Sequence, residues 1–324
     1  MKYILFSFAL IFLSACNNKP VVNNTNTHKD ITETKKQVVV NFDENGAYDF
    51  IQKQVDFGPR VPGTKEHLAC YNYLVEVLKP LADTMYFQNT FATTFDKKTI
   101  PVKNIIATFN TPKETRIILC AHWDTRPFAD QDTKDKDMPI LGANDGGSGV
   151  GVLLQIAKNL SIQKPEIGID IILFDSEDWG DATGGVEDSY CLGSQAWGKA
   201  PHIRGYKADF GILLDMVGAP NATFGNEGYS MQNANTALSI VWQAAASAGY
   251  DNYFRNFETN RITDDHYYVW KNTGIPTIDI IHHDQNSRNG FGEYWHTHND
   301  NMNAIDKKTL KAVGQTLVNV IYNY

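Results

Sequence analysis

Cysteine is scarce in this chain of 324 residues, which contains only four cysteines and no Cys-x-x-Cys pair. A metal site built on paired cysteines is therefore excluded. An exported protein could use a disulfide, but Cys70, Cys120 and Cys191 are odd in number and widely spaced, and they suggest no pairing. Because Cys120 ends an apolar stretch, we expect it to be a buried free thiol.

Positive charge is also in short supply. Lys and Arg total 29 against 37 Asp and Glu, which gives a net charge of −8. This balance argues against a nucleic-acid partner, although it does not identify a substrate. A hydrophobic content of 42% and an aromatic content of 12% are typical of a globular protein with a sizeable core.

The apolar region at the start of the chain, Ile4–Leu13, is too short to span a membrane. It follows Lys2 and leads into Leu13-Ser14-Ala15-Cys16, a small-residue cleavage site. This pattern predicts a secretory signal peptide over residues 1–15. The ending resembles the bacterial lipobox, which implies a lipidated Cys16; a plain signal peptide cut near Cys16 is the alternative.

Residues 16–42 are polar for most of their length and lack periodicity, so we expect a tether between lipid and domain. The implied protein is exported and lipid-anchored to the cell envelope, facing the periplasm. Asn17 rather than Asp after the lipid cysteine resembles the sorting signal for the outer membrane. We expect residues 43–324 to form a single catalytic domain.

Apolar strands alternate with helical spacing through most of this region, which predicts an α/β fold. An early hairpin makes the central sheet mixed and otherwise mostly parallel. We expect helices at 48–55, 65–78, 149–160, 234–248, 264–271 and 307–324, and strands at 85–95, 102–109, 117–120, 171–174, 210–214 and 276–281. Thr64 and Asp264 are the expected N-caps of two of these helices.

Two carboxylates, Glu177 and Asp178, follow the apolar strand at 171–174. Ligands of open α/β sheets bind at the carboxyl ends of strands, and adjacent carboxylates repel unless a cation or a proton lies between them. We therefore interpret Asp178 as a metal ligand and Glu177 as a general base. An acidic, solvated loop is the alternative.

Four further residues lie near predicted element ends: His122, Asp145, Asp215 and His296. Each alone has an ordinary explanation as a core histidine, a helix cap or a hydrogen-bonded loop residue. Three ligands drawn from His and carboxylates, with a fourth position open, suit catalytic zinc. Asp145, Asp178 and His296 can fill such a site, and the glycines around Asp145 allow a close backbone approach.

The order of these motifs resembles the co-catalytic zinc aminopeptidase superfamily, and within it the bacterial-type glutaminyl-peptide cyclotransferases (glutaminyl cyclases). The similarity is close at Leu213–Asn221, at Ile262-Thr263-Asp264-Asp265-His266 and at Phe291-x-x-x-Trp295-His296-Thr297. It implies a three-layer sandwich of the zinc exopeptidase type, with helices on both faces of the sheet.

The resemblance also implies roles for individual residues. It implies one Zn²⁺ per chain, held by Asp145, Asp178 and His296, with Glu177 as the catalytic acid and base. Asp215 and Asp264 match the carboxylates of a proton network. Ile262, Phe291 and Trp295 match the walls of the substrate pocket, although ordinary core packing would also account for them. The implied reaction converts the N-terminal glutamine of peptides or proteins to pyroglutamate (5-oxoproline) and releases ammonia, and the resemblance favours a monomer.

Two other functions stay open at this point. A two-zinc aminopeptidase could bind a second metal through His122 and Asp215, but relatives of that kind usually lack a carboxylate at the position of Asp264. A non-catalytic lipoprotein could retain the fold for binding alone. We expect Asp124 to orient the imidazole of His122. We expect His67 to be solvated.

Overall fold

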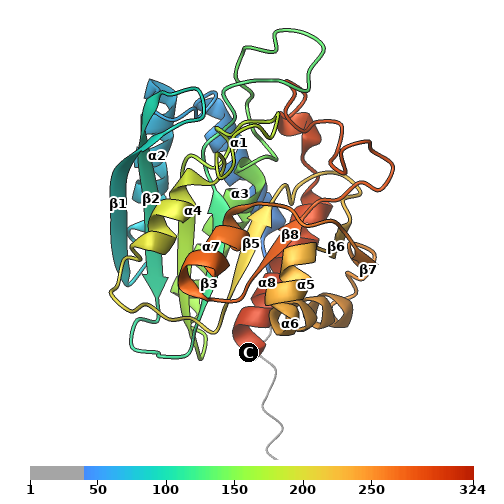
Figure 1. Ribbon diagram of the computed structural model, residues 1–324. Helices are drawn as coiled ribbons and strands as arrows, with labels where there is room; N and C mark the ends of the chain where they lie inside the picture. Colours follow the sequence, from blue (N-terminus) through green and yellow to red (C-terminus); the bar gives the residue numbers. More distant parts are fainter. Residues whose placement is uncertain (1–39) are drawn as a thin grey trace, which may run out of the picture. The chain divides into compact units, whose positions relative to one another are not determined.

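The computed structural model describes residues 40–324 (Figure 1). The predicted signal peptide, Cys16 and nearly all of the predicted tether lie outside these residues. Helices occur at α1 (Glu44–Asp56), α2 (Lys65–Leu78), α3 (Gly147–Ile162), α4 (Leu192–Lys199), α5 (Gly228–Asn233), α6 (Asn235–Ser247), α7 (Asp265–Thr273), the 3₁₀ turn η1 (Met302–Ala304) and α8 (Lys307–Asn323). Strands occur at β1 (Thr84–Thr93), β2 (Thr99–Phe109), β3 (Arg116–His122), β4 (Gly168–Phe174), β5 (Phe210–Asp215), β6 (Phe224–Asn226), β7 (Phe254–Glu258) and β8 (Thr277–Ile281).

Six strands form one sheet in the order β1-β2-β4-β3-β5-β8. The hairpin strands β1 and β2 pair antiparallel with each other, and β2 pairs antiparallel with β4. The neighbours β4, β3, β5 and β8 are parallel throughout. The predicted mixed, mostly parallel sheet is therefore confirmed.

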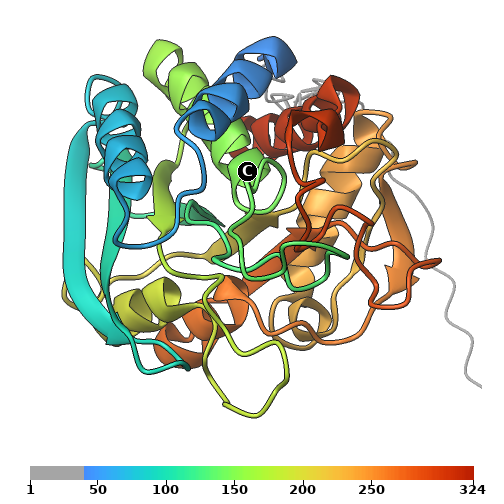
Figure 2. The same ribbon diagram turned by 90° about the horizontal axis from the view of Figure 1, so that it is seen from above.

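Helices cover both faces of this sheet, as Figure 2 shows from above. One layer contains α1, α3 and α8, which pack against one another, and α3 also packs on β3 and β5. The opposite layer contains α4 and α7, which contact each other, β2, β5 and β8. The expected three-layer arrangement is confirmed.

The central strands β3, β4 and β5 are mainly apolar because both of their faces are buried. In β4, Ile169, Ile171 and Leu173 belong to the large core on the α3 side. Ile172 and Phe174 point to the other side and pack with Trp197 of α4. The predicted doubly buried strand is present, extended by a few residues at its start.

Capping follows the sequence signals at two helices. The Thr64 side chain accepts a hydrogen bond from the backbone N–H of His67, and the Asp264 carboxylate accepts one from the N–H of Asp265. The short elements α4, α5, β6 and β7 were not predicted. The parallel pair β6–β7 contains only three and five residues, which is too few for a periodic signal.

One expectation was wrong. His67 is 1% exposed rather than solvated, because its Nε2 lies 2.9 Å from Asp175 Oδ1 and its ring stacks on Trp123. A carboxylate partner and an aromatic face together compensate a histidine for the loss of water. The predicted buried free thiol of Cys120 is confirmed.

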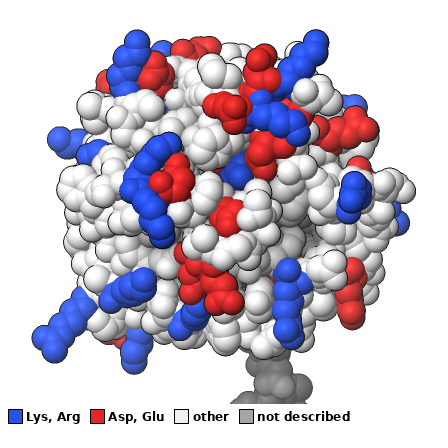
Figure 3. Space-filling model, turned by 45° about the horizontal axis from the view of Figure 1, so that its top comes forward, with Lys and Arg blue, Asp and Glu red and all other residues white. Residues whose placement is uncertain are grey.

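The surface of the described residues carries charges of both signs. On the face that Figure 3 shows, Lys and Arg side chains are interspersed with Asp and Glu and gather into no continuous basic patch. Within residues 40–324, none of the helices combines the length and the hydropathy that a membrane crossing requires.

Candidate metal centre and active site

A pocket of about 150 Å³ opens at the carboxyl ends of the parallel strands. All nine site residues expected from the sequence line it: Asp145, Glu177, Asp178, Asp215, Ile262, Asp264, Phe291, Trp295 and His296. The topology accounts for this convergence, because parallel strands end at the same edge of a sheet and the connecting loops meet there.

The predicted zinc ligands come from three separate loops. Asp145 precedes α3, Asp178 follows β4, and His296 lies between β8 and α8. Their ligand atoms lie within 4.8 Å of one another, and all three side chains are buried. His296 Nε2 is 3.3 Å from Asp178 Oδ1 and 3.8 Å from Asp145 Oδ2.

This donor set fits a zinc ion. Imidazole nitrogens and carboxylate oxygens both bind zinc, and a catalytic zinc ion takes three protein ligands. Asp178 Oδ2 is buried without a hydrogen-bond partner, and a buried carboxylate oxygen in that state is stabilised by a cation. Asp145 and Asp178 also raise each other's electrostatic energy in the absence of a positive charge between them.

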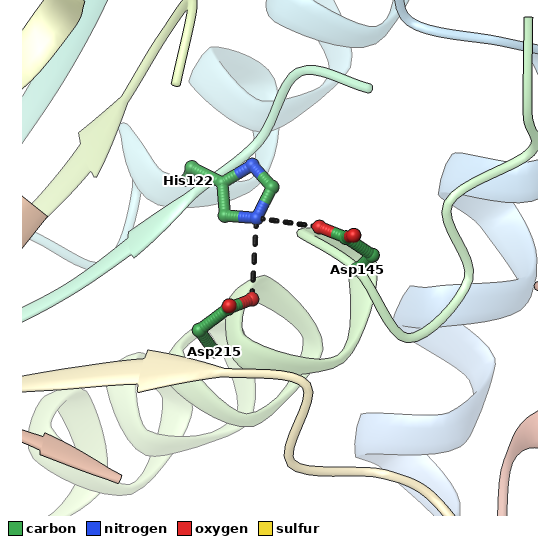
Figure 4. Close-up of side chains that lie close together, drawn as sticks. All are labelled: His122, Asp145 and Asp215. Carbon is green, nitrogen blue, oxygen red and sulfur yellow. Dashed lines mark hydrogen bonds and ion pairs between the residues drawn. The ribbon is translucent and has the colours of Figure 1, made fainter. Parts of the chain in front are cut away.

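A second cluster consists of His122, Asp145 and Asp215 (Figure 4), and it shares Asp145 with the first. His122 Nε2, at the end of β3, lies 3.1 Å from Asp145 Oδ1 and 3.3 Å from Asp215 Oδ1. Asp145 therefore contacts both histidines, one with each carboxylate oxygen. This is the geometry that a second metal would need, so the two-metal alternative has a physical basis in the structure.

Asp124 organises the backbone of the acidic turn. Its carboxylate accepts hydrogen bonds from the N–H groups of Glu177 and Asp178, at 3.0 and 3.2 Å. Its Oδ1 also lies 3.5 Å from His122 Nδ1, which is in line with the expected orienting contact. A single carboxylate thus holds both the candidate base and the neighbouring candidate ligand in place.

Glu177 lies beside the candidate ligands in an environment that favours its protonated form. Burial raises the pKa of Glu177 well above its usual range; His122 opposes this shift, whereas Asp178 and Asp264 add to it. The Cys191 thiol donates a hydrogen bond to Glu177 Oε1 at 3.3 Å. A carboxyl group with a raised pKa is a stronger base, and once protonated it can return the proton.

Asp215 and Asp264 line the same pocket and also retain protons more readily than free aspartates. Burial raises the pKa of Asp215 to about 7, with His122 opposing the shift and Asp145 and Asp264 adding to it. Burial likewise raises the pKa of Asp264. A neutral carboxyl group can donate a hydrogen bond to a substrate amide as well as accept one.

The aromatic wall is continuous with the metal cluster. The rings of Phe291 and Trp295 lie 4.7 Å apart, and the Trp295 ring stacks on the imidazole of His296 at 3.7 Å. Ile262, Phe291 and Trp295 are half-buried rather than enclosed in the core. These three side chains therefore present apolar surface to whatever enters the pocket.

Four lining residues were missed: Tyr190, Met216, Thr263 and Ile281. Met216, Thr263 and Ile281 each adjoin a predicted site residue or end a predicted strand, so proximity to those signals could have identified them. Tyr190 lies in a loop with no periodicity, and nothing in its neighbourhood of the sequence points to the pocket.

The chain is similar to known proteins over most of its length. The model of the family described as Peptidase family M28 matches residues 104–321. A Bos taurus protein named glutaminyl-peptide cyclotransferase is 24% identical over 294 residues, covering 82% of this chain and 78% of the relative.

Two solved structures are similar at higher identity. The glutaminyl cyclase of Bacteroides thetaiotaomicron, bound to N-acetylhistamine, is 48% identical and has a TM-score of 0.86, with 89% of this chain and 100% of that chain covered. A Zn-dependent exopeptidase from Parabacteroides distasonis is 47% identical with a TM-score of 0.87, at the same coverage of 89% and 100%.

Proposed function

The chain belongs to Peptidase family M28, and from this premise we propose that it is a zinc-dependent glutaminyl-peptide cyclotransferase. It converts the N-terminal glutamine of peptides or proteins to pyroglutamate and releases ammonia. One observation carries the proposal: the nine side chains expected of such an enzyme line one pocket in a chain that is 48% identical to a solved glutaminyl cyclase.

The reaction joins two groups of the same residue, so the pocket acts first by holding the glutamine side chain folded. The α-amine is the nucleophile and the γ-amide carbon is the electrophile. Phe291, Trp295 and Ile262 can pack against the methylene groups and exclude water. Holding the two groups at contact supplies a large part of the rate enhancement in an intramolecular reaction.

Glu177 then moves the proton. It takes one from the α-amino group as the amine attacks, and it returns one to the γ-nitrogen as ammonia leaves. Burial of Glu177 suits both directions because it raises the pKa of the carboxyl group. Asp215 and Asp264, which line the same pocket, can exchange hydrogen bonds with the substrate amide. Zinc, when bound by Asp145, Asp178 and His296, would act as a Lewis acid toward the γ-carbonyl group.

We propose one zinc ion per chain. The two-zinc aminopeptidase remains the second candidate, because His122, Asp145 and Asp215 form a cluster of suitable size. Against it, burial raises the pKa of Asp215 and the Asp145 and Asp264 carboxylates add to this shift, so this ligand would hold a proton in competition with a second metal. Metal analysis of purified protein at saturating zinc distinguishes the two.

The activity test compares two peptides that differ only at the N-terminus. We expect a Gln-initiated peptide to lose ammonia, detected by mass, and a Leu-initiated peptide to stay intact. Removing the general base in Glu177→Gln should lower kcat by about 10²- to 10⁴-fold with zinc still bound. Glu187→Gln, in an exposed loop, is the matched control and should retain wild-type activity.

Three results would contradict the proposal. Release of leucine together with two zinc ions per chain would favour the aminopeptidase. No turnover of either peptide by zinc-loaded protein would favour the non-catalytic binding protein. Full cyclisation by Glu177→Gln would remove Glu177 from the mechanism.

We also propose a cellular localisation for the protein, and this proposal is supported by the sequence alone. Residues 1–15 act as a signal peptide and Cys16 carries the lipid. Residues 16–42 tether a monomeric domain to the periplasmic side of the outer membrane. Cys16→Ala should abolish incorporation of labelled fatty acid and move the protein from the membrane fraction to the soluble fraction. Unchanged labelling would contradict the lipid anchor.

A further inference from the structure

A buried arginine side chain lies beside the candidate zinc ligands. Arg126, in the loop after β3, is 2% exposed. Its Nη1 donates to both the backbone oxygen and Oδ1 of Asp178, at 3.0 and 3.1 Å, and its Nη2 donates to the Gly180 carbonyl at 3.4 Å. The planar guanidinium group thus donates hydrogen bonds to both the main chain and the side chain of one candidate ligand.

The same guanidinium is tied to the second ligand through Asp130. Arg126 Nε donates to Asp130 Oδ1 at 2.6 Å, and that oxygen also lies 3.2 Å from His296 Nδ1. This ring nitrogen is buried and has no hydrogen bond of good geometry, so its contact with Asp130 is an ion-pair distance only. The far nitrogen, Nε2, faces Asp145 and Asp178.

The electrostatics of the site explain why a cation lies beside the candidate ligands. Asp145 and Asp178 are two buried carboxylates in one small site, and such a pair is unstable without positive charge. Arg126 supplies a permanent charge on the side of Asp178 away from the pocket, and the Tyr190 ring lies over it at 5.6 Å. A carboxylate at the outer nitrogen of a histidine fixes the tautomer that leaves the inner nitrogen free for metal.

We propose that Arg126 and Asp130 are positioning residues for the zinc site, which set the orientation of Asp178 and His296 and so determine the affinity for zinc. The inference rests on the zinc requirement of the proposed function. It assigns to these two residues a role that the pocket lining does not reveal, because neither of them lines the pocket.

The test measures zinc affinity rather than turnover. Zinc is titrated into metal-free protein in competition with a chromophoric chelator. Removing the charge of the outer carboxylate in Asp130→Asn should raise the zinc dissociation constant by about 10- to 100-fold. Arg126→Lys keeps the charge but lacks the fork, so it should weaken binding by a smaller factor. Both variants should alter the visible absorption spectrum of the Co²⁺-substituted protein, which reports ligand geometry.

The chain offers a matched control. Arg116 and Asp170 form another buried ion pair, with N–O distances of 2.8 Å. Asp170 lies in the first half of β4, about 13 Å along the strand from the edge that carries the site. Asp170→Asn removes a comparable pair and should leave zinc affinity and the Co²⁺ spectrum unchanged. Circular dichroism melts identify any variant that fails to fold, and Arg126→Lys, the milder change, is then the deciding variant.

Wild-type zinc affinity in folded Asp130→Asn and Arg126→Lys would overturn the inference. Equal weakening by Asp170→Asn would also overturn it, because the effect would then be general loss of stability. The proposed function fails separately: wild-type protein that binds zinc but does not cyclise Gln-initiated peptides would contradict the cyclotransferase and leave the positioning role intact.

Discussion

Individual residues at this site adopt backbone conformations that their side chains disfavour. Ser176, Met216 and His296 have φ angles of 57°, 49° and 55°, in the left-handed region that non-glycine residues occupy at a cost of about 1–3 kcal/mol each. Ser176 precedes Glu177, Met216 follows Asp215, and His296 is itself a candidate ligand. At these three positions the strained backbone lies where the chain turns to direct a side chain into the pocket.

His282 provides a prediction at the residue scale. It is 8% exposed, and its Nδ1 lies 2.8 Å from the Tyr294 hydroxyl. Burial lowers its pKa to about 4, with Asp284 opposing the shift and His283 adding to it. Since the unfolded chain binds this proton with a pKa near 6.5, the stabilising contribution is present above that pH and is lost as the pH falls toward 4.

Between about pH 7.5 and about pH 5, this one group should lower the free energy of unfolding by about 2 kcal/mol. His282→Asn cannot titrate in this range, so its stability should fall less than that of the wild type. Urea unfolding of both proteins at the two pH values measures the difference. An identical loss in the two proteins would show that His282 is not held neutral in the fold.

At the scale of elements, helix α3 positions one candidate ligand by its close approach to the sheet. Gly149 lies in its first turn, and a Cβ there would collide with the Leu214 carbonyl oxygen of β5 and lie 2.9 Å from Ala121 Cβ of β3. The absence of a side chain lets the N-terminus of α3, and with it Asp145, reach the ends of both strands.

We therefore expect Gly149→Ala to destabilise the protein by about 1–3 kcal/mol, the usual cost of overpacking. Because the added methyl group would push the start of α3 away from the strands and displace Asp145, the affinity for zinc should fall as well. Thermal melts and chelator competition measure the two effects. Gly185→Ala is the control, since its Cβ would meet only side-chain tips, at 3.2 and 3.5 Å. Wild-type stability of Gly149→Ala would show that α3 can move without loss.

The elements that the sequence predicted are those with a strong local signal. The apolar strands β3, β4, β5 and β8 could be located because both of their faces are buried, and α2 and α7 because Thr64 and Asp264 cap them. Helix α4 could not, since its eight residues contain two glycines and form too short a stretch for a clear apolar face. Loops have no periodicity, so the contacts of Tyr190 and Asp130 could not be predicted from the sequence.

At the scale of the whole described chain, the site depends on connections that no local pattern contains. Sequence reasoning could state that strand ends gather at one edge of the sheet, and so could group Asp178 and Asp215. It placed Asp145 and His296 with them because His and carboxylates suit zinc and by resemblance to a family, since no local pattern gives the direction of these two loops. The start of the described chain shows the same limit: Phe42, on the tether side of the expected boundary at residue 43, is 1% exposed.

Phe42 joins the beginning of the described chain to its end. Its N–H donates to Gln315 Oε1 at 2.9 Å, Gln315 Nε2 donates to the Val40 carbonyl at 2.8 Å, and its ring packs against Gly314 of α8. Phe42→Ala should therefore lower the free energy of unfolding by about 3–5 kcal/mol, as expected for a buried aromatic ring. Phe91→Ala, at a ring that is 73% exposed, should change it little. Chemical unfolding of zinc-saturated protein measures both. Zinc affinity should be unaffected by either change, since neither ring lines the pocket. A Phe42→Ala protein as stable as the wild type would show that the folded domain starts after this residue.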